Sequence, residues 1–332
     1  MDAKLYLLTS LLSVWIFMTG CSNLETSPTT DIHIPAQSEW VDQGIILEAG
    51  KEGEWDYYLW GGFAFSVIKK DGTYYLYYQG SSDYRTEYDE TVMWRAIGVA
   101  TSTDGIHFTK YAGSPVVRWF PNQEGEEGAV SSGITLGEQG ETFLFYGANS
   151  FESRTLVSSN GRVASSLDGF NFTDLGIALD GKDRSTWGGG DEVFPVTAIH
   201  HAGKWILYYI PNGSPESGLL GVAYGNQYDS LTRSSAVKSD GKSIYVWGTA
   251  GNVKLDSDIY ALILNNVRER RTEVRLVSMQ RPDRVSEPVE VYQFDEVQQA
   301  FLLLDEERES WFMYYRTHEN SYGLKMAPAS TR

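Results

Sequence analysis

The side chains that could bind a metal ion or a phosphate are few and poorly spaced in this sequence. His200 and His201 are adjacent, and neighbouring residues of a strand point to opposite faces, so the pair cannot share one transition metal. Asp256 and Asp258 offer two oxygens on one face at most, whereas calcium takes about six to eight ligands. Gly188–Gly190 lacks the lysine and the following helix of a phosphate-binding loop. We therefore predict no cofactor and no metal, and we leave open only a calcium ion.

Aromatic and arginine side chains suggest a different chemistry, which is contact with sugar rings. The chain has 10 Trp and 21 Tyr. A tryptophan face packs against the C–H groups of a pyranose, and arginine can bond paired hydroxyls. The candidates for such contacts are Trp60, Arg95, Trp187, Arg316 and His318. Aromatic residues also suit a β-sheet core, so composition alone does not decide between the two roles.

Cys21 is the only cysteine of the 332 residues, so neither an intramolecular disulfide nor a cysteine-based zinc site is expected. It follows an apolar run, Leu5–Met18, that is shorter than the ~20 residues a transmembrane helix needs. Met18–Cys21 resembles a lipobox, and we predict a signal peptide over 1–20 and a lipid on Cys21. Residues 21–38, rich in Ser, Thr and Pro, are predicted to form a flexible tether. Ordinary secretion with cleavage nearby is the alternative.

The net charge of −17 argues against nucleic acid or an anionic membrane surface as partner, because both require basic patches. We expect membrane contact through the lipid alone. The predicted location is the cell envelope, in the periplasm or on the outer-membrane surface, and the protein is expected to be a monomer.

The elements that must position these side chains are strands. Three aromatic or β-branched runs each follow a glycine turn, at Asp71–Gly72, Gln139–Gly140 and Ala202–Gly203. The glycines of these turns lie 68 and then 63 residues apart. A second segment recurs after the first two runs, as Ile97–Phe108 and Gly161–Phe172. This period is typical of one four-stranded propeller blade with long loops.

Two weaker copies extend the repeat, so that we predict a five-bladed β-propeller, an all-β fold, over 39–330. The fourth copy is predicted to open at Asp240–Trp247, and the fifth spans 300–327. The segment Trp40–Leu47 is expected to supply the strand that closes the ring and protects its edges.

The order of these motifs resembles that of the five-bladed propeller glycosidases. Trp55–Asp56 is followed by a strand that ends in Asp71–Gly72, and then by the Gly-Val-Ala-Thr-Ser-Thr-Asp-Gly segment 98–105. The pattern, from Trp40 to Ala327, is similar to that of glycoside hydrolase family 43 and its fructan-cleaving and mannoside-phosphorolysing relatives. The resemblance implies a glycoside hydrolase that acts on a poly- or oligosaccharide. Some relatives carry a calcium ion on the propeller axis, which is the axial calcium ion that we leave open.

In that family, carboxylates from the first three blades point into the axial pocket. Glycosidic cleavage needs one carboxyl group protonated, to donate to the leaving oxygen, and another ionised. The resemblance places these groups at Asp56, at Glu127 or the adjacent Glu126, and at Glu192 as the general acid. Glu287, assigned to the fifth blade, is a competing candidate for the acid.

Other carboxylates and other functions complete the predictions. Asp104 and Asp168 lie in Ser-x-Asp-Gly turns, where we expect them to accept backbone N–H bonds rather than catalyse. The family's Asp-Pro pair in the first blade is Ala64–Phe65 here, which keeps a non-catalytic glycan-binding protein as an alternative. Phosphorolysis would need clustered cations, and Arg95, Arg184 and Arg316 are scattered. A purely structural or protein-docking propeller is the third alternative.

Overall fold

The computed structural model is all-β, as the sequence predicts. It describes residues 27–59, 65–82, 95–117, 126–137, 139–152, 155–183, 185–190, 192–246, 248, 250–266, 268–293, 299–317 and 319–329. One short 3-10 helix, η1 (Gln37–Glu39), is the single helical element in these ranges. Within them, no helix is long and apolar enough to cross a membrane.

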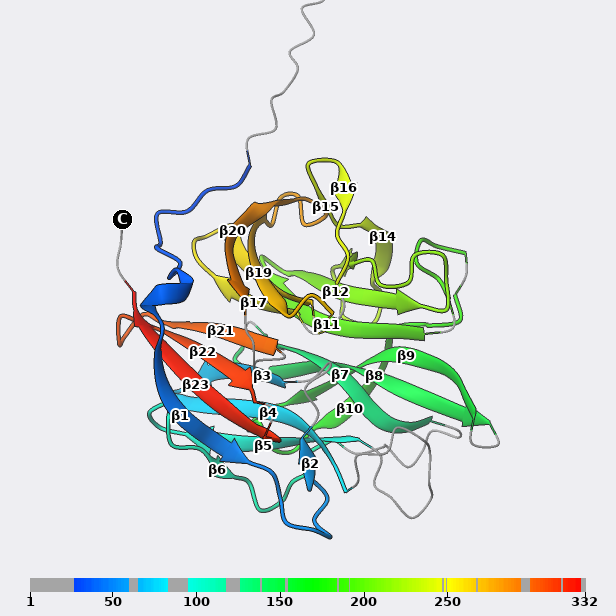
Figure 1. The fold of residues 1–332 in the computed structure, drawn as a ribbon. Helices are drawn as coiled ribbons and strands as arrows, with labels where there is room; N and C mark the ends of the chain where they lie inside the picture. Colours follow the sequence, from blue (N-terminus) through cyan, green and yellow to red (C-terminus); the bar gives the residue numbers. More distant parts are fainter. Residues whose placement is uncertain are drawn as a thin grey trace, which may run out of the picture.

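The strands form antiparallel units of four that follow one another along the chain, and we number these units 1 to 5 (Figure 1). Unit 1 contains β3 (Phe65–Lys70), β4 (Thr73–Ser81), β5 (Ala96–Ser102) and β6 (Thr109–Lys110), with the short β2 (Tyr58–Leu59) also paired to β4. Unit 2 contains β7 (Glu126–Leu136), β8 (Thr142–Glu152), β9 (Thr155–Ser166) and β10 (Thr173–Leu179). Unit 3 contains β11 (Glu192–His201), β12 (Lys204–Asn212), β13 (Gly221–Gly225) and β14 (Thr232–Ala236).

The last two units have the same order of pairing. Unit 4 contains β17 (Ala250–Lys254), β18 (Ile259–Asn266), β19 (Arg271–Ser278) and β20 (Val285–Gln293). Unit 5 contains β21 (Gln299–Asp305), β22 (Ser310–Arg316), β23 (Ser321–Pro328) and, from the other end of the chain, β1 (Val41–Glu48). A separate hairpin of β15 (Lys238–Ser239) and β16 (Lys242–Ser243) lies between units 3 and 4 in the sequence.

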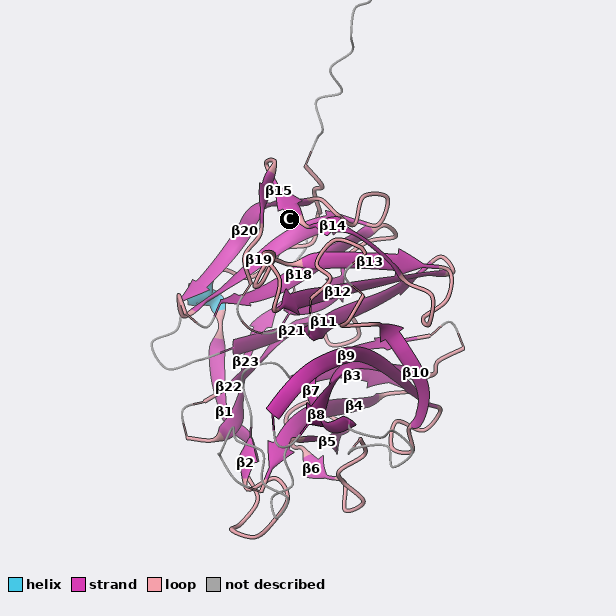
Figure 2. Ribbon diagram, turned by 90° about the vertical axis from the view of Figure 1, so that its right-hand side faces the viewer, coloured by secondary structure: helices cyan, strands magenta, loops and turns pink. Residues whose placement is uncertain are grey.

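The first strands of the units contact one another in a closed order. β3 contacts β7, β7 contacts β11, β11 contacts β17, β17 contacts β21, and β21 returns to β3. The approach of β7 to β11 is close enough to require glycine, because a Cβ on Gly133 would lie 2.7 Å from Thr197 Cα. The units are therefore arranged around their first strands, and Figure 2 shows units 3 and 4 in its upper part and units 1 and 2 in its lower part.

The apolar core lies between the units rather than within one of them. Each pair of neighbouring units shares one cluster of buried side chains; Leu76 and Phe312 join units 1 and 5, and Ile206 and Leu262 join units 3 and 4. Each face of a unit therefore buries its apolar residues against the next unit, as face-to-face packed sheets do.

The N-terminal strand closes the last unit. β1 pairs antiparallel with β23, from Val41 opposite Met326 to Glu48 opposite Ser321. This confirms that the segment predicted at Trp40–Leu47 is the strand that completes this sheet.

The glycine turns were predicted correctly, but the start of unit 4 was not. Asp71 and Gly72 have φ values of 49° and 75°, and Ala202 and Gly203 have 48° and 73°, as tight hairpins require. The segment Asp240–Trp247, predicted to open the fourth unit, instead contains β16 of the separate hairpin, and unit 4 begins at β17. The reason is that an Asp-Gly turn indicates a hairpin but does not show to which sheet that hairpin belongs.

Tyrosine hydroxyls connect neighbouring units in a repeated way. Tyr77 of β4 donates to the carbonyl of Gly169 in unit 2 at 2.9 Å, and Tyr314 of β22 donates to that of Gly105 in unit 1 at 3.0 Å. Each bond runs from the second strand of one unit to the turn between the third and fourth strands of the next. Tyr208 makes the equivalent bond from unit 3 to the carbonyl of Pro282 in unit 4, at 3.0 Å.

The Ser-x-Asp-Gly turns that receive two of these bonds have the predicted structural role. Asp104 Oδ1 accepts the backbone N–H groups of Ile106 and His107 at 2.8 Å, and it also accepts the Ser102 hydroxyl. Asp168 Oδ1 accepts two backbone N–H groups in the same way. These hydrogen bonds hold the pKa of Asp168 well below its usual value.

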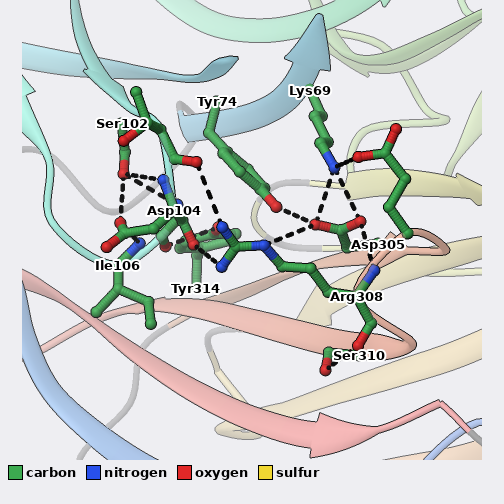
Figure 3. Close-up of polar contacts among 12 residues, drawn as sticks. Lys69, Tyr74, Ser102, Asp104, Ile106, Asp305, Arg308, Ser310 and Tyr314 are labelled. Carbon is green, nitrogen blue, oxygen red and sulfur yellow. Dashed lines mark hydrogen bonds and ion pairs between the residues drawn. The ribbon is translucent and has the colours of Figure 1, made fainter. Parts of the chain in front are cut away.

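A buried ionic cluster joins units 1 and 5 at the end of their first strands (Figure 3). Asp305 is 2% exposed and accepts Lys69 Nζ at 3.0 Å, together with the hydroxyl of Tyr74. Arg308 donates from Nη1 to the carbonyl of Asp104 at 2.8 Å, so the cluster reaches the first Ser-x-Asp-Gly turn. Burial, followed by the bond to Asp305, raises the pKa of Tyr74 to about 12.

Candidate functional site

Two of the predicted catalytic residues, Glu127 and Glu192, lie in one row of backbone pairs in the sheet that units 2 and 3 share. Glu127 is opposite Asn149, Asn149 is opposite Ser159, Ser159 is bridged to Glu192, and Glu192 is opposite Asn212. The bridge between Ser159 and Glu192 is parallel, and it joins both units into one sheet. β7 and β11 therefore run in the same direction. Their starting ends, where the Glu126–Glu127 pair and Glu192 lie, face the same side of the molecule.

Glu192 is the first residue of β11, and its carboxylate is half-buried. Its Oε2 accepts a hydrogen bond from Asn212 Nδ2 at 2.6 Å. Ser159, next to it in the row, is fully buried, and its hydroxyl has no hydrogen-bond partner among the described residues. Among the described residues, Glu192 is thus held by a neutral hydrogen-bond donor and not by a cation.

The loop before Glu192 is held in place by unit 3. Arg233 of β14 donates from Nη1 to the carbonyl of Asp183 at 2.8 Å and from Nη2 to the carbonyl of Asp180. Tyr209 Oη donates to the carbonyl of Trp187 at 3.2 Å, and the two rings meet edge to face at 6.3 Å. Trp187, a predicted sugar contact, is therefore fixed close in sequence to Glu192 and remains partly exposed.

Arg233 is a positioning residue that the sequence analysis did not identify. The sequence gives little indication of this role, because a single arginine in the polar segment Thr232–Ala236 does not show which loop its side chain contacts.

Asp56 is placed differently from the other two catalytic candidates. It is 3% exposed, and its Oδ2 accepts Lys110 Nζ at 2.6 Å and the hydroxyl of Tyr78 at 3.2 Å. Lys110 belongs to β6, the outermost strand of unit 1, and the preceding Trp55 stacks on Tyr78 at 5.7 Å. The partners of Asp56 are those of a buried structural ion pair, and none of them belongs to the row that contains Glu192.

Arg316 also has structural partners. It is 3% exposed at the end of β22; its Nε donates to the carbonyl of Leu59 at 2.9 Å, and its guanidinium lies 5.5 Å above the ring of Tyr58. It therefore ties β2 to unit 5. Asn320 strengthens this connection, because it accepts the Leu59 N–H at 2.6 Å and donates to the carbonyl of Tyr57.

Arg95 immediately precedes β5 with a left-handed φ of 65°, which is uncommon for a residue other than glycine. Burial lowers its pKa to about 10. The other predicted contacts, Trp60 and His318, lie outside the described residues, as do Cys21 and Arg184.

The position of Glu287 corrects its assignment to the fifth repeat. It lies on β20, the fourth strand of unit 4, where its carboxylate accepts the Ser239 hydroxyl at 2.8 Å. It is thus distant in the sheet order from the first strands. The sequence analysis did not recognise the strand that contains Glu287 as the last strand of the fourth repeat.

Asp256 and Asp258, the acidic residues considered for calcium, each interact with a different partner. Asp258 pairs with His201 Nε2 at 3.0 Å, whereas Asp256 accepts the backbone N–H of Ser257. In the part of the chain that the structure describes, no three His, Cys, Asp or Glu side chains are grouped as metal ligands.

Comparison with known proteins identifies the fold but not a family. No family model matches the chain, and no curated protein matches it in sequence. Solved structures do match. A glycosyl hydrolase from Bacteroides ovatus has a TM-score of 0.56 at 15% identity, over 84% of this chain and 87% of that chain.

Two further structures have the same fold. A family 117 glycoside hydrolase from the marine bacterium Zobellia galactanivorans has a TM-score of 0.60 at 13% identity, over 89% of this chain and 92% of that one. A β-1,2-mannobiose phosphorylase from Listeria innocua, solved with β-1,2-mannobiose, has a TM-score of 0.58 at 13% identity, over 85% and 94%. The chain therefore has the propeller-type fold of glycoside hydrolases and mannoside phosphorylases.

Proposed function

We propose that this protein is a five-bladed β-propeller glycoside hydrolase, with units 1 to 5 as its blades. The observation that carries the proposal is the row that aligns Glu127 with Glu192 at the starting ends of β7 and β11. Fold alone does not define function, so the proposal depends on these two carboxylates and on the loop that presents Trp187.

Glu192 is the general acid in this proposal, and Glu127 or Glu126 is the base. Three strand spacings of about 4.8 Å separate Glu127 from Glu192 along the sheet, and β7 also contacts β11 directly, so the two backbones lie at most roughly 14 Å apart. Retaining enzymes hold their carboxyl groups only ~5 Å apart, whereas inverting enzymes leave ~6.5–9.5 Å for a water molecule. In either case Glu192 protonates the leaving oxygen, while the glutamate of β7 activates water in inversion or attacks the anomeric carbon itself in retention.

The substrate in this proposal is a poly- or oligosaccharide. Trp187 packs against a sugar ring, and Trp60, Arg95 and His318 remain proposed contacts. Asp56 and Arg316 are assigned structural roles because their polar groups are already engaged by Lys110 and by the carbonyl of Leu59.

The test is hydrolysis of a broad panel of glycans by the wild type and by Glu192→Gln and Glu127→Gln. We expect each variant to lose at least ~100-fold in kcat on the glycan that is cleaved, the size of a general acid or base contribution. Glu287→Gln is the matched control and should retain activity. NMR of the first product anomer distinguishes inversion from retention; full activity of Glu192→Gln would exclude the assigned acid.

A glycan-binding protein without catalysis is the second candidate. It is favoured by the ion pair of Asp56, because the carboxylate predicted for catalysis in unit 1 is already engaged by Lys110. Binding of a glycan with no cleavage, in the presence or absence of inorganic phosphate, would establish it. Cleavage that requires phosphate would instead identify a phosphorylase.

We also propose that the chain is a monomeric lipoprotein of the cell envelope, acylated on Cys21 after removal of residues 1–20. Mass spectrometry of the N-terminal peptide measures this directly. An unmodified thiol on the mature protein would refute it.

A further inference from the structure

A cavity of about 890 Å³ lies at the end of unit 4 where β18 begins and β19 ends. Its walls come from the turn between β19 and β20, from the β15–β16 hairpin, and from Ser27, Pro28 and Thr29 of the N-terminal segment. β20 and this hairpin lie side by side in Figure 1. The cavity shares no residue with the candidate glycosidase site.

The cavity has charged groups of both signs. Lys238, Arg281 and Arg284 supply cations, and Asp240 and Glu287 supply carboxylates. Opposite charges that line one cavity usually pair with each other, but no ion pair joins Lys238 to Asp240 in the described part of the chain. The one described ion pair of Arg284 is to Asp283 outside the cavity, at 3.5 Å. Nε is the arginine atom of this pair; it is buried and donates no hydrogen bond to any described residue.

The geometry points to a zwitterionic ligand for this cavity, one that carries a phosphate and a primary ammonium group, and we propose the phosphoethanolamine headgroup of a membrane lipid. The phosphate is bound by Arg284 and Lys238, since guanidinium and ammonium groups are the usual phosphate donors. The ammonium is bound by Asp240. A simple anion would bring a second negative charge beside this exposed carboxylate, and like charges repel.

The position of the N-terminal segment supports a membrane source for the headgroup. Cys21 precedes Ser27 by six residues, and an extended chain spans at most ~3.6 Å per residue, so the two lie within about 22 Å. A lipid on Cys21 would therefore keep Ser27, in the wall of this cavity, within about 22 Å of the membrane surface. This step rests on the proposed acylation, whereas headgroup binding itself does not, and neither depends on glycan cleavage.

The first experiment is calorimetric titration of the full chain, in a non-ionic detergent, with glycerophosphoethanolamine. We expect binding that weakens at least about tenfold in Lys238→Gln and in Arg284→Gln, the loss expected for one charge-assisted hydrogen bond. Asp240→Asn should weaken glycerophosphoethanolamine binding but not the binding of inorganic phosphate. Lys204→Gln, an exposed lysine of unit 3, is the control and should bind as the wild type does.

Three outcomes would overturn the inference. They are no detectable heat with the wild type, equal affinity for inorganic phosphate and glycerophosphoethanolamine, and unchanged binding in both cation variants. The membrane source is tested separately by flotation of the full chain with vesicles of phosphatidylethanolamine or of phosphatidylcholine. Preference for phosphatidylethanolamine that is lost in Arg284→Gln supports it, and equal flotation with both lipids refutes it, whatever the result for glycan hydrolysis.

Discussion

Replacement of Asp305 by asparagine should break the ionic cluster that joins units 1 and 5. Asp305 is 2% exposed and is bonded by Lys69 Nζ at 3.0 and 3.1 Å, by the Tyr74 hydroxyl and by the Arg308 N–H at 3.3 Å. Removing one partner of a buried ion pair costs about 3–5 kcal/mol, because the other charge remains uncompensated. Lys69 is partly exposed and keeps a second partner in Glu307, so we expect a loss of about 3 kcal/mol in the free energy of unfolding.

The matched control is Glu307→Gln, which removes the other carboxylate bound to the same lysine. Glu307 lies 2.6 Å from Lys69 Nζ, but its side chain is 81% exposed. Pairs on the surface contribute up to about 1 kcal/mol, so this variant should change stability little. The two variants therefore compare a buried with an exposed carboxylate, both of which lie within hydrogen-bond distance of Lys69 Nζ.

The effect of Asp305 should depend on pH. Burial alone would raise the pKa of Asp305, but the hydrogen bonds from Tyr74 and Lys69 outweigh it and hold that pKa below its ordinary value. A carboxyl group whose pKa is lowered by folding stabilises the protein above its unfolded pKa of ~3.9, and this stability is lost as pH falls through the native value. The difference between wild type and Asp305→Asn should therefore be full at pH 7 and shrink below about pH 4.

Urea unfolding followed by tryptophan fluorescence measures these differences. Similar m-values for the wild type and both variants would show that the same surface unfolds in each. A loss below about 1 kcal/mol for Asp305→Asn, or an equal loss for Glu307→Gln, would refute the argument from burial.

Two further changes test the packing of the units. Asp168→Asn should destabilise the protein by about 1–2 kcal/mol in urea unfolding, because Oδ1 accepts the N–H groups of Phe170 and Asn171, and it should leave glycan cleavage unchanged. Gly133→Ala should cost about 1–3 kcal/mol in the same assay, since its Cβ would lie 2.7 Å from Thr197 Cα; a stability equal to wild type would show that β7 and β11 can move apart.

Local signals in the sequence predicted most of the strands. The turns at Asp71–Gly72 and Ala202–Gly203 could be identified because a hairpin needs residues that accept positive φ. Asp104 and Asp168 could be assigned to turns because their partners lie two and three residues away. The start of unit 4 could not be predicted, because a short hairpin and a blade strand have similar turn residues.

The candidate site was harder to predict because it depends on contacts distant in sequence. The row from Glu127 to Glu192 depends on the bridge between β9 and β11, which no local pattern indicates. Asp56 illustrates the same limit, since its partner Lys110 lies 54 residues away. A carboxylate after a tryptophan has the same local sequence whether it faces a pocket or a lysine.

The pairing of β1 with β23 has a consequence for how the protein folds. Val41 of β1 pairs with Met326 of β23, which lies 285 residues later in the chain. The strand β1 can therefore join its sheet only after β23 has been synthesised. Contacts so distant in sequence slow folding, because the entropy of closing the loop is lost before they form. Until then, the edge of β23 is open to other chains, and aggregation competes with closure during this interval.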